Sequence, residues 1–207
     1  MRPAWTWDLL ANDPYTYALL DRDTPADSLA AFVNSQLAPD FDWKDAEWLC
    51  QEWDGPVAIK GVVRPEDAKR ALDTGFSTIW VSNHGGRQLD GSPATIDVLP
   101  KIRDAVGDDV EIILDGGVQR GTDIAKALAL GANAVGIGKP NLYGLGAGGT
   151  AGTKKAMEIL RVELERAMGL LGTGAVADLR ARGKEPVVRR PASGRDNEGA
   201  RYSSGII

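Results

Sequence analysis

The sequence predicts an α/β fold with about four parallel strands, half the number in a (β/α)8 TIM barrel. From residue 57 onward, short β-rich runs alternate with helical periods, as in βα units around a parallel sheet. A complete barrel needs about 250 residues, whereas this chain has 207. The strand runs fall near residues 57–61, 78–82, 110–114 and 134–138.

One βα unit occurs twice in this region. Residues 67–82 align without gaps on residues 123–138, with matching letters at helix and turn positions. Gly75 and Gly131 each follow an apolar helix face, where a left-handed glycine commonly ends a helix. Pro65 is expected at the first helical position of the earlier unit, because proline there loses no hydrogen bond.

Helices without strands are expected on both sides of these units. The first 55 residues show helical spacing and no strand run, and Asp42 is placed to cap a helix. Residues 153–171 have an amphipathic pattern and residues 175–180 predict a shorter helix, whereas the glycine-rich residues 144–152 are interpreted as a flexible connection. The apolar positions of the longer helix are Met157, Leu160, Leu164, Met168 and Leu171.

The end of the chain differs in composition from the rest. From Lys184 it is polar and rich in proline and glycine, which is typical of an unstructured segment. The predicted organisation is one partial barrel domain over residues 1–183 and a disordered tail over residues 184–207.

Composition and charge exclude several classes of protein. The 24 Lys and Arg against 29 Asp and Glu give a net charge of −5, which argues against a nucleic-acid partner. One cysteine and one histidine leave no intrachain disulfide and no zinc cluster, so no metal site is predicted. No apolar run reaches the roughly 18 residues of a membrane span, and no signal peptide begins the sequence. These features favour a cytoplasmic protein, in solution or peripheral to a membrane.

The segment SNHGGRQLDG, residues 82–91, directly follows a predicted strand and contains His84. In parallel α/β folds the carboxyl ends of the strands face the ligand. His84 and Arg87 would therefore combine a base that titrates near neutral pH with a guanidinium that binds carboxylates. The alternative is a polar loop whose histidine caps a strand, but the adjacent pair Gly85-Gly86 favours close approach to a ligand.

Further strand ends carry residues suited to an anionic cofactor. Lys60 ends the strand run VAIK, where its ammonium either stabilises an anion or extends into solvent. The runs LDGGVQRGTD (114–123) and GIGKP (136–140) place glycine loops after the last two strands, with Arg120 near a helix expected to start about Thr122. Such paired loops form a phosphate site in many barrels.

These sequence motifs together resemble the FMN-dependent α-hydroxy-acid oxidases and dehydrogenases, a family that includes glycolate oxidase and L-lactate dehydrogenase. The resemblance extends from about residue 3 to residue 172 and matches only the C-terminal half of that family. It is carried by IKGV (59–62), SNHGGRQLDG (82–91), DGGVQRGTD (115–123), ALALGANAVGIGKP (127–140) and the YGLGAGGTAG that follows.

The resemblance implies a role for each site residue. Lys60 would contact the flavin ring, Ser82 would touch the flavin, His84 would be the catalytic base against the substrate, and Arg87 would hold the substrate carboxylate. The family usually has arginine where this chain has Gln119 and Lys139. The ribityl chain and phosphate of FMN would be held by Asp115, Gly116, Gly117, Val118, Gln119, Gly138 and Lys139.

The activity implied is oxidation of a small L-2-hydroxy carboxylic acid, such as lactate or glycolate, to the 2-oxo acid. FMN would take the electrons and pass them to oxygen, a quinone or a cytochrome. Because only half of the family's barrel is matched, the resemblance implies a truncated chain that is inactive unless an N-terminal half or another copy of the chain completes it.

Two alternatives remain open from the sequence. One is a non-catalytic half-barrel that binds a phosphate or a flavin and acts through self-association, since an open half-barrel exposes two sheet edges. The other is a different phosphate-binding barrel, such as an inosine-monophosphate-type dehydrogenase. Cys50 lies in a helical segment and not in a strand-end loop, which argues against that second alternative.

Overall fold

The computed structural model describes residues 3–12, 38–185 and 187. The chain divides into two compact units, residues 1–45 and 46–207. The first unit contains α1 (Pro3–Ala11) and the start of α3 (Trp43–Glu52). Asp42 caps α3, because its Oδ1 accepts hydrogen bonds from the N–H groups of Lys44 at 2.6 Å and Asp45 at 3.2 Å. The predicted cap is confirmed, while the rest of the helical lead-in and the predicted tail lie mostly outside the described residues.

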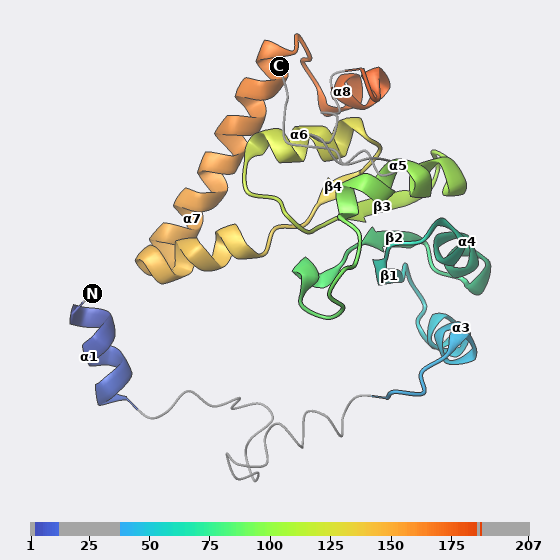
Figure 1. Cartoon of the computed structure of the whole chain (residues 1–207), viewed down its shortest axis with the longest axis horizontal. Helices are drawn as coiled ribbons and strands as arrows, with labels where there is room; N and C mark the ends of the chain where they lie inside the picture. The colour runs from blue at the N-terminus through green and yellow to red at the C-terminus, as the bar shows by residue number, and fades with distance from the viewer. Residues whose placement is uncertain (1–2, 13–37, 186, 188–207) are drawn as a thin grey trace. The chain divides into compact units, whose positions relative to one another are not determined.

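Four parallel strands form one sheet in the order β1-β2-β3-β4 (Figure 1). The prediction of four parallel strands is confirmed, but the last strand is shorter than the expected run over 134–138. The Gly136 N–H still donates to the Leu114 carbonyl at 2.8 Å, and the chain then turns away from the ladder. The strands are β1 (Ala58–Val62), β2 (Thr78–Val81), β3 (Glu111–Leu114) and β4 (Ala134–Val135).

Each strand is joined to the next by a helix: α4 (Pro65–Thr74), α5 (Thr95–Val106) and α6 (Gly121–Ala129). Pro65 occupies the first turn of α4, as predicted. Gly75 and Gly131 have positive φ angles of 117° and 110°, and their N–H groups donate to Leu72 and Leu128. The two repeated units therefore end their helices with the same turn.

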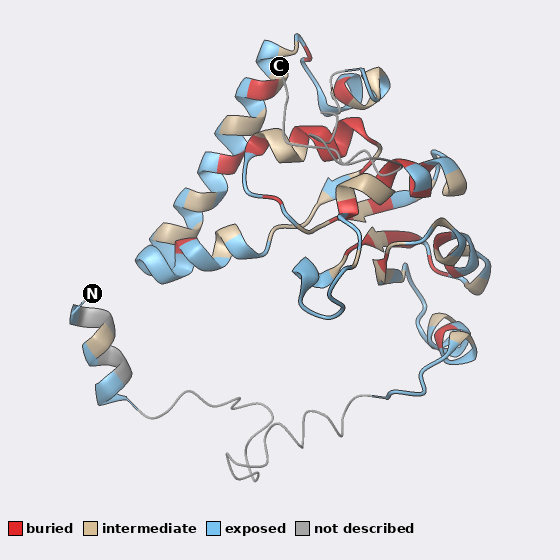
Figure 2. Ribbon diagram, in the orientation of Figure 1, coloured by how far each residue is buried: buried red, intermediate tan, exposed pale blue. Residues whose placement is uncertain are grey.

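The core lies between the sheet and these helices (Figure 2). Ile79, Val81, Ile112 and Leu114 are at most 1% exposed. Because side chains alternate along a strand, the intervening residues of β2 and β3 point to the opposite face of the sheet. That face carries the cleft described below.

The glycine-rich segment 144–152 is helical and not a flexible connection, which corrects the sequence interpretation. It belongs to α7 (Lys139–Leu170), which contains a break at Gly148 and Gly149. The two halves of α7 approach so closely that a Cβ on Gly144 would lie 2.6 Å from the Gly152 carbonyl oxygen. This close approach explains the glycines at positions 144 and 152, despite the low helix propensity of glycine.

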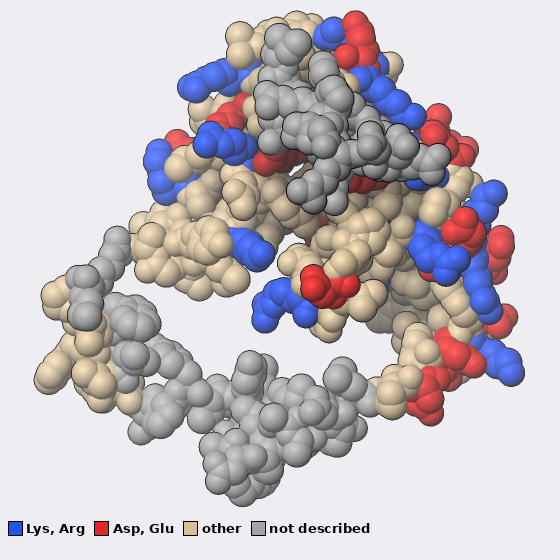
Figure 3. Space-filling view, in the orientation of Figure 1, with Lys and Arg blue, Asp and Glu red and all other residues tan. Residues whose placement is uncertain are grey.

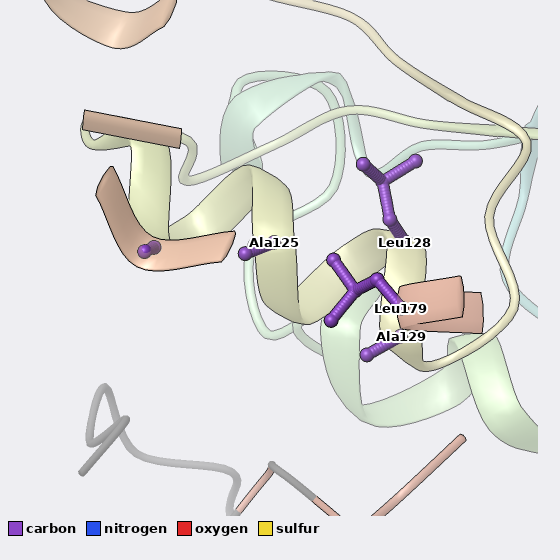
Figure 4. Close-up of a cluster of buried hydrophobic side chains, with 5 residues drawn as sticks. Ala125, Leu128, Ala129 and Leu179 are labelled. Carbon is purple, nitrogen blue, oxygen red and sulfur yellow. The ribbon is translucent and has the colours of Figure 1, made fainter. Parts of the chain in front are cut away.

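A second apolar cluster joins α6, α7 and α8 (Val176–Arg182) (Figure 4). It contains Ala125, Leu128, Ala129, Ala167 and Leu179, the last of which is fully buried. The predicted apolar face of the long helix is largely confirmed. Leu160 is buried and Leu164, Met168 and Leu171 pack against the cluster, whereas Met157 is 47% exposed.

The surface of the described residues has no continuous patch of one charge on the face seen in Figure 3, where acidic and basic side chains alternate. No helix in the described part of the chain is both long and apolar enough to cross a membrane. The same residues contain no group of three His, Cys, Asp or Glu side chains that could hold a metal ion.

A Gly121→Ala substitution is expected to lower the free energy of unfolding by about 3 kcal/mol, the upper part of the range for over-packing. A Cβ there would overlap the Leu164 amide nitrogen and lie 2.5 Å from the Glu163 carbonyl carbon, and backbone cannot move aside like a side chain. Urea denaturation followed by circular dichroism measures the change. Gly146→Ala is the matched control, because an added Cβ there meets nothing within 4 Å. Equal stability of the two variants would contradict the expectation.

Candidate functional site

The ends of all four strands open into one cleft of about 670 Å³. This volume lies within the range of roughly 300–1,000 Å³ that is usual for cofactor and ligand pockets. Every site residue predicted from the sequence lines the cleft except Ser82, which lies buried beside it. The lining consists of Lys60, Trp80, His84, Gly85, Arg87, Gln88, Asp115, Gly116, Gly117, Val118, Gln119, Gly136, Ile137, Gly138, Lys139 and Leu142.

Lys60 is held by its neighbours and does not simply extend into solvent. Its Nζ donates to Ser82 Oγ at 3.1 Å and lies 3.5 Å from Asp115 Oδ2. The same atom lies 5.7 Å from the centroid of the Trp80 ring. The side chain retains 38% exposure, so a fixed positive charge faces the cleft.

His84 lies on the short turn η2 (His84–Gly86), directly after β2. Its φ of 55° is in the left-handed region, and its N–H donates to the buried Ser82 Oγ at 3.1 Å. A Cβ on Gly61 would lie 3.0 Å from His84 Cε1, so the glycine at the irregularity of β1 leaves room for the imidazole. The side chain is exposed, and the described residues provide no hydrogen-bond partner for the ring nitrogens.

Arg87 follows the same turn and also lines the cleft. Its N–H donates to the His84 carbonyl at 3.4 Å, which sets the spacing between the two residues. Within the described chain its guanidinium forms no ion pair, and it is exposed. The imidazole and the guanidinium therefore reach one cleft from a single turn, as predicted.

The loop after β3 supplies backbone donors. Thr95 Oγ1 donates to the Asp115 carbonyl at 2.6 Å and so anchors the loop from behind. Gly116 and Gly117 have φ angles of 97° and 77°, which few other residues adopt. No hydrogen bond within the described part of the chain uses the N–H groups of Gly116, Gly117 or Val118. These three donors suit a phosphate or a ribityl hydroxyl.

The loop after β4 contributes from the other side. Gly138 precedes the first residue of α7, and an added Cβ at Gly138 would meet nothing within 4 Å. Lys139 begins α7, and its Nζ would lie 4.0 Å from a Cβ on Gly85. The cation and the helix start therefore face the same cleft as the loop after β3.

At the amino end of α6, three backbone N–H groups are already paired with carboxylates. Asp123 Oδ2 accepts from the N–H groups of Gln119 at 3.1 Å and Arg120 at 3.0 Å. Glu163 Oε2 accepts from the Gly121 N–H at 2.8 Å, and its other oxygen lies 3.7 Å from Arg120 Nη1. Two carboxylates thus occupy these donors, and Arg120 is not part of the cleft lining.

Sequence reasoning missed three residues that shape the site. Asn83 Oδ1 accepts from the Gly85 N–H at 3.0 Å, and its Nδ2 donates to the Pro93 carbonyl at 3.1 Å, so Asn83 fixes both ends of the loop. Thr95 anchors the loop after β3, and Trp80 contacts Lys60. Of these, Trp80 could have been found from the alternation of side chains, because it lies on β2 two residues before Ser82, which directly follows that strand.

The residues present fit FMN. A fixed cation at Lys60 suits the electron-rich edge of a reduced flavin, and unused backbone N–H groups with Lys139 suit a phosphate. The open space around Gly117 and Gly138 leaves room for a cofactor at the cleft wall.

Four parallel strands joined by helices, with this cleft at their carboxyl ends, define an α/β protein with the fold of part of a parallel barrel. The chain belongs to the FMN-dependent dehydrogenase family, whose model matches residues 1–184.

Relatives and solved structures agree with this assignment. The chain is 52% identical to a pre-mycofactocin synthase of Mycolicibacterium smegmatis, over 68% of this chain and 35% of that protein. It is 40% identical to an L-lactate dehydrogenase of Actinobacillus pleuropneumoniae, over 86% of this chain and 48% of that protein. A structure of the monotopic membrane protein (S)-mandelate dehydrogenase superposes with a TM-score of 0.79 at 31% identity, covering 87% of this chain and 48% of that one. The chain thus spans half or less of the length of these proteins.

Proposed function

We propose that this chain binds FMN in the cleft and takes part in the oxidation of a small L-2-hydroxy acid to the 2-oxo acid. The observation that carries the proposal is the single turn after β2, which brings His84 and Arg87 to the cleft that Lys60 and Gly116–Val118 also line. Family membership supports it, because FMN-dependent dehydrogenases share this cofactor.

The roles of the side chains follow from their chemistry. Arg87 would bind the substrate carboxylate through two parallel hydrogen bonds. His84 would accept a proton from the substrate, since neutral imidazole is a base near the operating pH. Lys60 would stabilise negative charge on the cofactor side of the cleft. FMN, when bound, supplies the two-electron acceptor that converts the alcohol to the ketone.

The backbone loops and Lys139 would bind the phosphate group. This part of the proposal does not depend on the identity of the hydroxy acid, because the groups involved belong to the loops after β3 and β4, whereas His84 follows β2. The relatives carry different names, so the substrate is assigned only as a 2-hydroxy acid and the electron acceptor as oxygen, a quinone or a cytochrome.

Titration of the purified 207-residue chain with FMN and with riboflavin tests the cofactor. Quenching of flavin fluorescence should give FMN at least about tenfold tighter binding than riboflavin, since a phosphate held by charge-assisted hydrogen bonds is worth more than a hydroxyl. Equal affinities would contradict the assigned phosphate loops.

Anaerobic addition of lactate, glycolate or mandelate to the FMN-loaded chain tests the reaction. Loss of the oxidised flavin absorbance with one of these acids, and not with acetate as a carboxylate control, is the expected result. Tight FMN binding without reduction by any 2-hydroxy acid would instead favour a half-barrel that binds the cofactor without catalysis. Re-oxidation by air, a quinone or cytochrome c then ranks the acceptors.

A further inference from the structure

We propose that Trp80 is a positioning residue that holds the Lys60 ammonium inside the cleft through the face of its indole ring. This proposal rests on the proposed function in one respect: the flavin is the group that the Lys60 ammonium would contact. The contact between the two side chains belongs to the chain alone and can be measured without a cofactor.

The geometry of the sheet places the two residues together. Lys60 and Trp80 are register partners in the parallel ladder between β1 and β2, so their side chains leave the sheet on the same face. The Lys60 Nζ lies 5.7 Å from the centroid of the Trp80 ring, within the range of about 6 Å for a cation–π contact. Tryptophan gives the strongest such contact among the aromatic side chains.

The indole completes a three-sided setting for the ammonium. Ser82 Oγ at 3.1 Å and Asp115 Oδ2 at 3.5 Å are its polar partners, and both lie at strand ends. A lysine side chain loses considerable rotamer freedom when it is fixed, and two polar contacts at a 38% exposed site compensate for only part of this loss. The ring of Trp80, with its centroid 5.7 Å from Lys60 Nζ, adds a third attraction.

The surroundings of Trp80 indicate that the ring face matters more than its N–H group. Trp80 Nε1 is buried and has no hydrogen-bond partner among the described residues. A buried N–H group without a hydrogen-bond partner is unfavourable. An apolar side chain could fill the same space without carrying this N–H group, so packing alone does not favour tryptophan here. Gly136 leaves space for the ring, because a Cβ there would lie 3.1 Å from Trp80 Cζ2 and 3.2 Å from Asp115 Cβ.

The test compares the acylation rate of Lys60 in flavin-free variants of the 207-residue chain, measured by mass spectrometry after brief exposure to an amine-reactive ester. Trp80→Leu removes the aromatic face and should raise the Lys60 rate about threefold, whereas Trp80→Phe keeps a face and should stay within about 1.5-fold of the parent. Lys139, in the same cleft, is the internal reference and should not change. Trp53→Leu is the matched control, because Trp53 is 64% exposed.

Two results would overturn the proposal: an unchanged Lys60 rate in Trp80→Leu, or a Trp80→Phe rate as high as that of Trp80→Leu. Circular dichroism checks that each variant is folded, and Trp80→Met replaces the leucine variant if that one is not. Failure of the chain to bind FMN would refute the proposed function but leave the labelling result unaffected. Normal FMN binding with unchanged labelling would refute only the role of Trp80.

Discussion

A His84→Asn variant is expected to reduce the rate of flavin reduction by the best 2-hydroxy acid between about 10²- and 10⁴-fold, the usual contribution of a general base. The amide side chain cannot accept a proton near neutral pH, so the step assigned to the imidazole is lost. Asparagine is chosen because it tolerates the left-handed φ of 55° at this position better than most residues. Stopped-flow absorbance of the bound flavin under anaerobic conditions measures the rate.

The FMN dissociation constant separates loss of the base from collapse of the turn. It should change by less than about threefold in His84→Asn, because the phosphate donors lie on other loops. Leu89→Ala is the matched control in the same loop, since Leu89 is 71% exposed and is not part of the cleft lining. A His84→Asn variant that reduces flavin at the parent rate would exclude His84 as the base.

Local patterns in the sequence were sufficient to predict the sheet and its turns. The alternation of β-rich runs and helical periods predicted the parallel strands. Residues close in the sequence, such as Pro65 at a helix start and Gly75 at a helix end, mark the boundaries of these elements. Gly75 and Gly131 have the left-handed conformations that their positions indicated. His84 and Arg87 reach the cleft as expected, since a strand end in a parallel sheet fixes the direction of the loop that follows.

Contacts between distant residues could not be predicted in the same way. Glu163 accepts from the Gly121 N–H across 42 residues, and nothing near Gly121 reveals that this helix end is already occupied. The glycines of 144–152 suggested a loop because helix propensity is a local preference. The close approach of Gly144 and Gly152, which excludes a side chain at either position, exists only in the folded chain.

An Arg103→Met variant is expected to lose about 3–4 kcal/mol of unfolding free energy, because several carbonyl groups lose a buried donor at once. Arg103 is 7% exposed and donates to the carbonyl oxygens of Gly131 and Val110 at 2.7 and 2.9 Å. It also donates to Asn133 Oδ1 at 2.7 Å, and that oxygen accepts from the Ile112 N–H. The guanidinium thus ties α5 to the segments that precede β3 and β4.

Burial lowers the pKa of the Arg103 guanidinium from its usual value, with a further lowering from Arg180 and an opposing effect of Asp108. Because an arginine guanidinium stays protonated in proteins, the loss in Arg103→Met should not vary between about pH 6 and 8. Urea denaturation at both pH values measures it. Lys101→Met, an exposed position on the same helix, should change stability by less than about 0.5 kcal/mol.

Arg103→Lys distinguishes the hydrogen bonds from the charge. Lysine keeps the positive charge, but its ammonium is a compact donor that cannot reproduce the planar fork which spans these three segments. It should therefore recover less than half of the stability lost in Arg103→Met. Full recovery by lysine would show that a buried positive charge is sufficient, and a loss below about 1 kcal/mol in Arg103→Met would show that water replaces the missing donors.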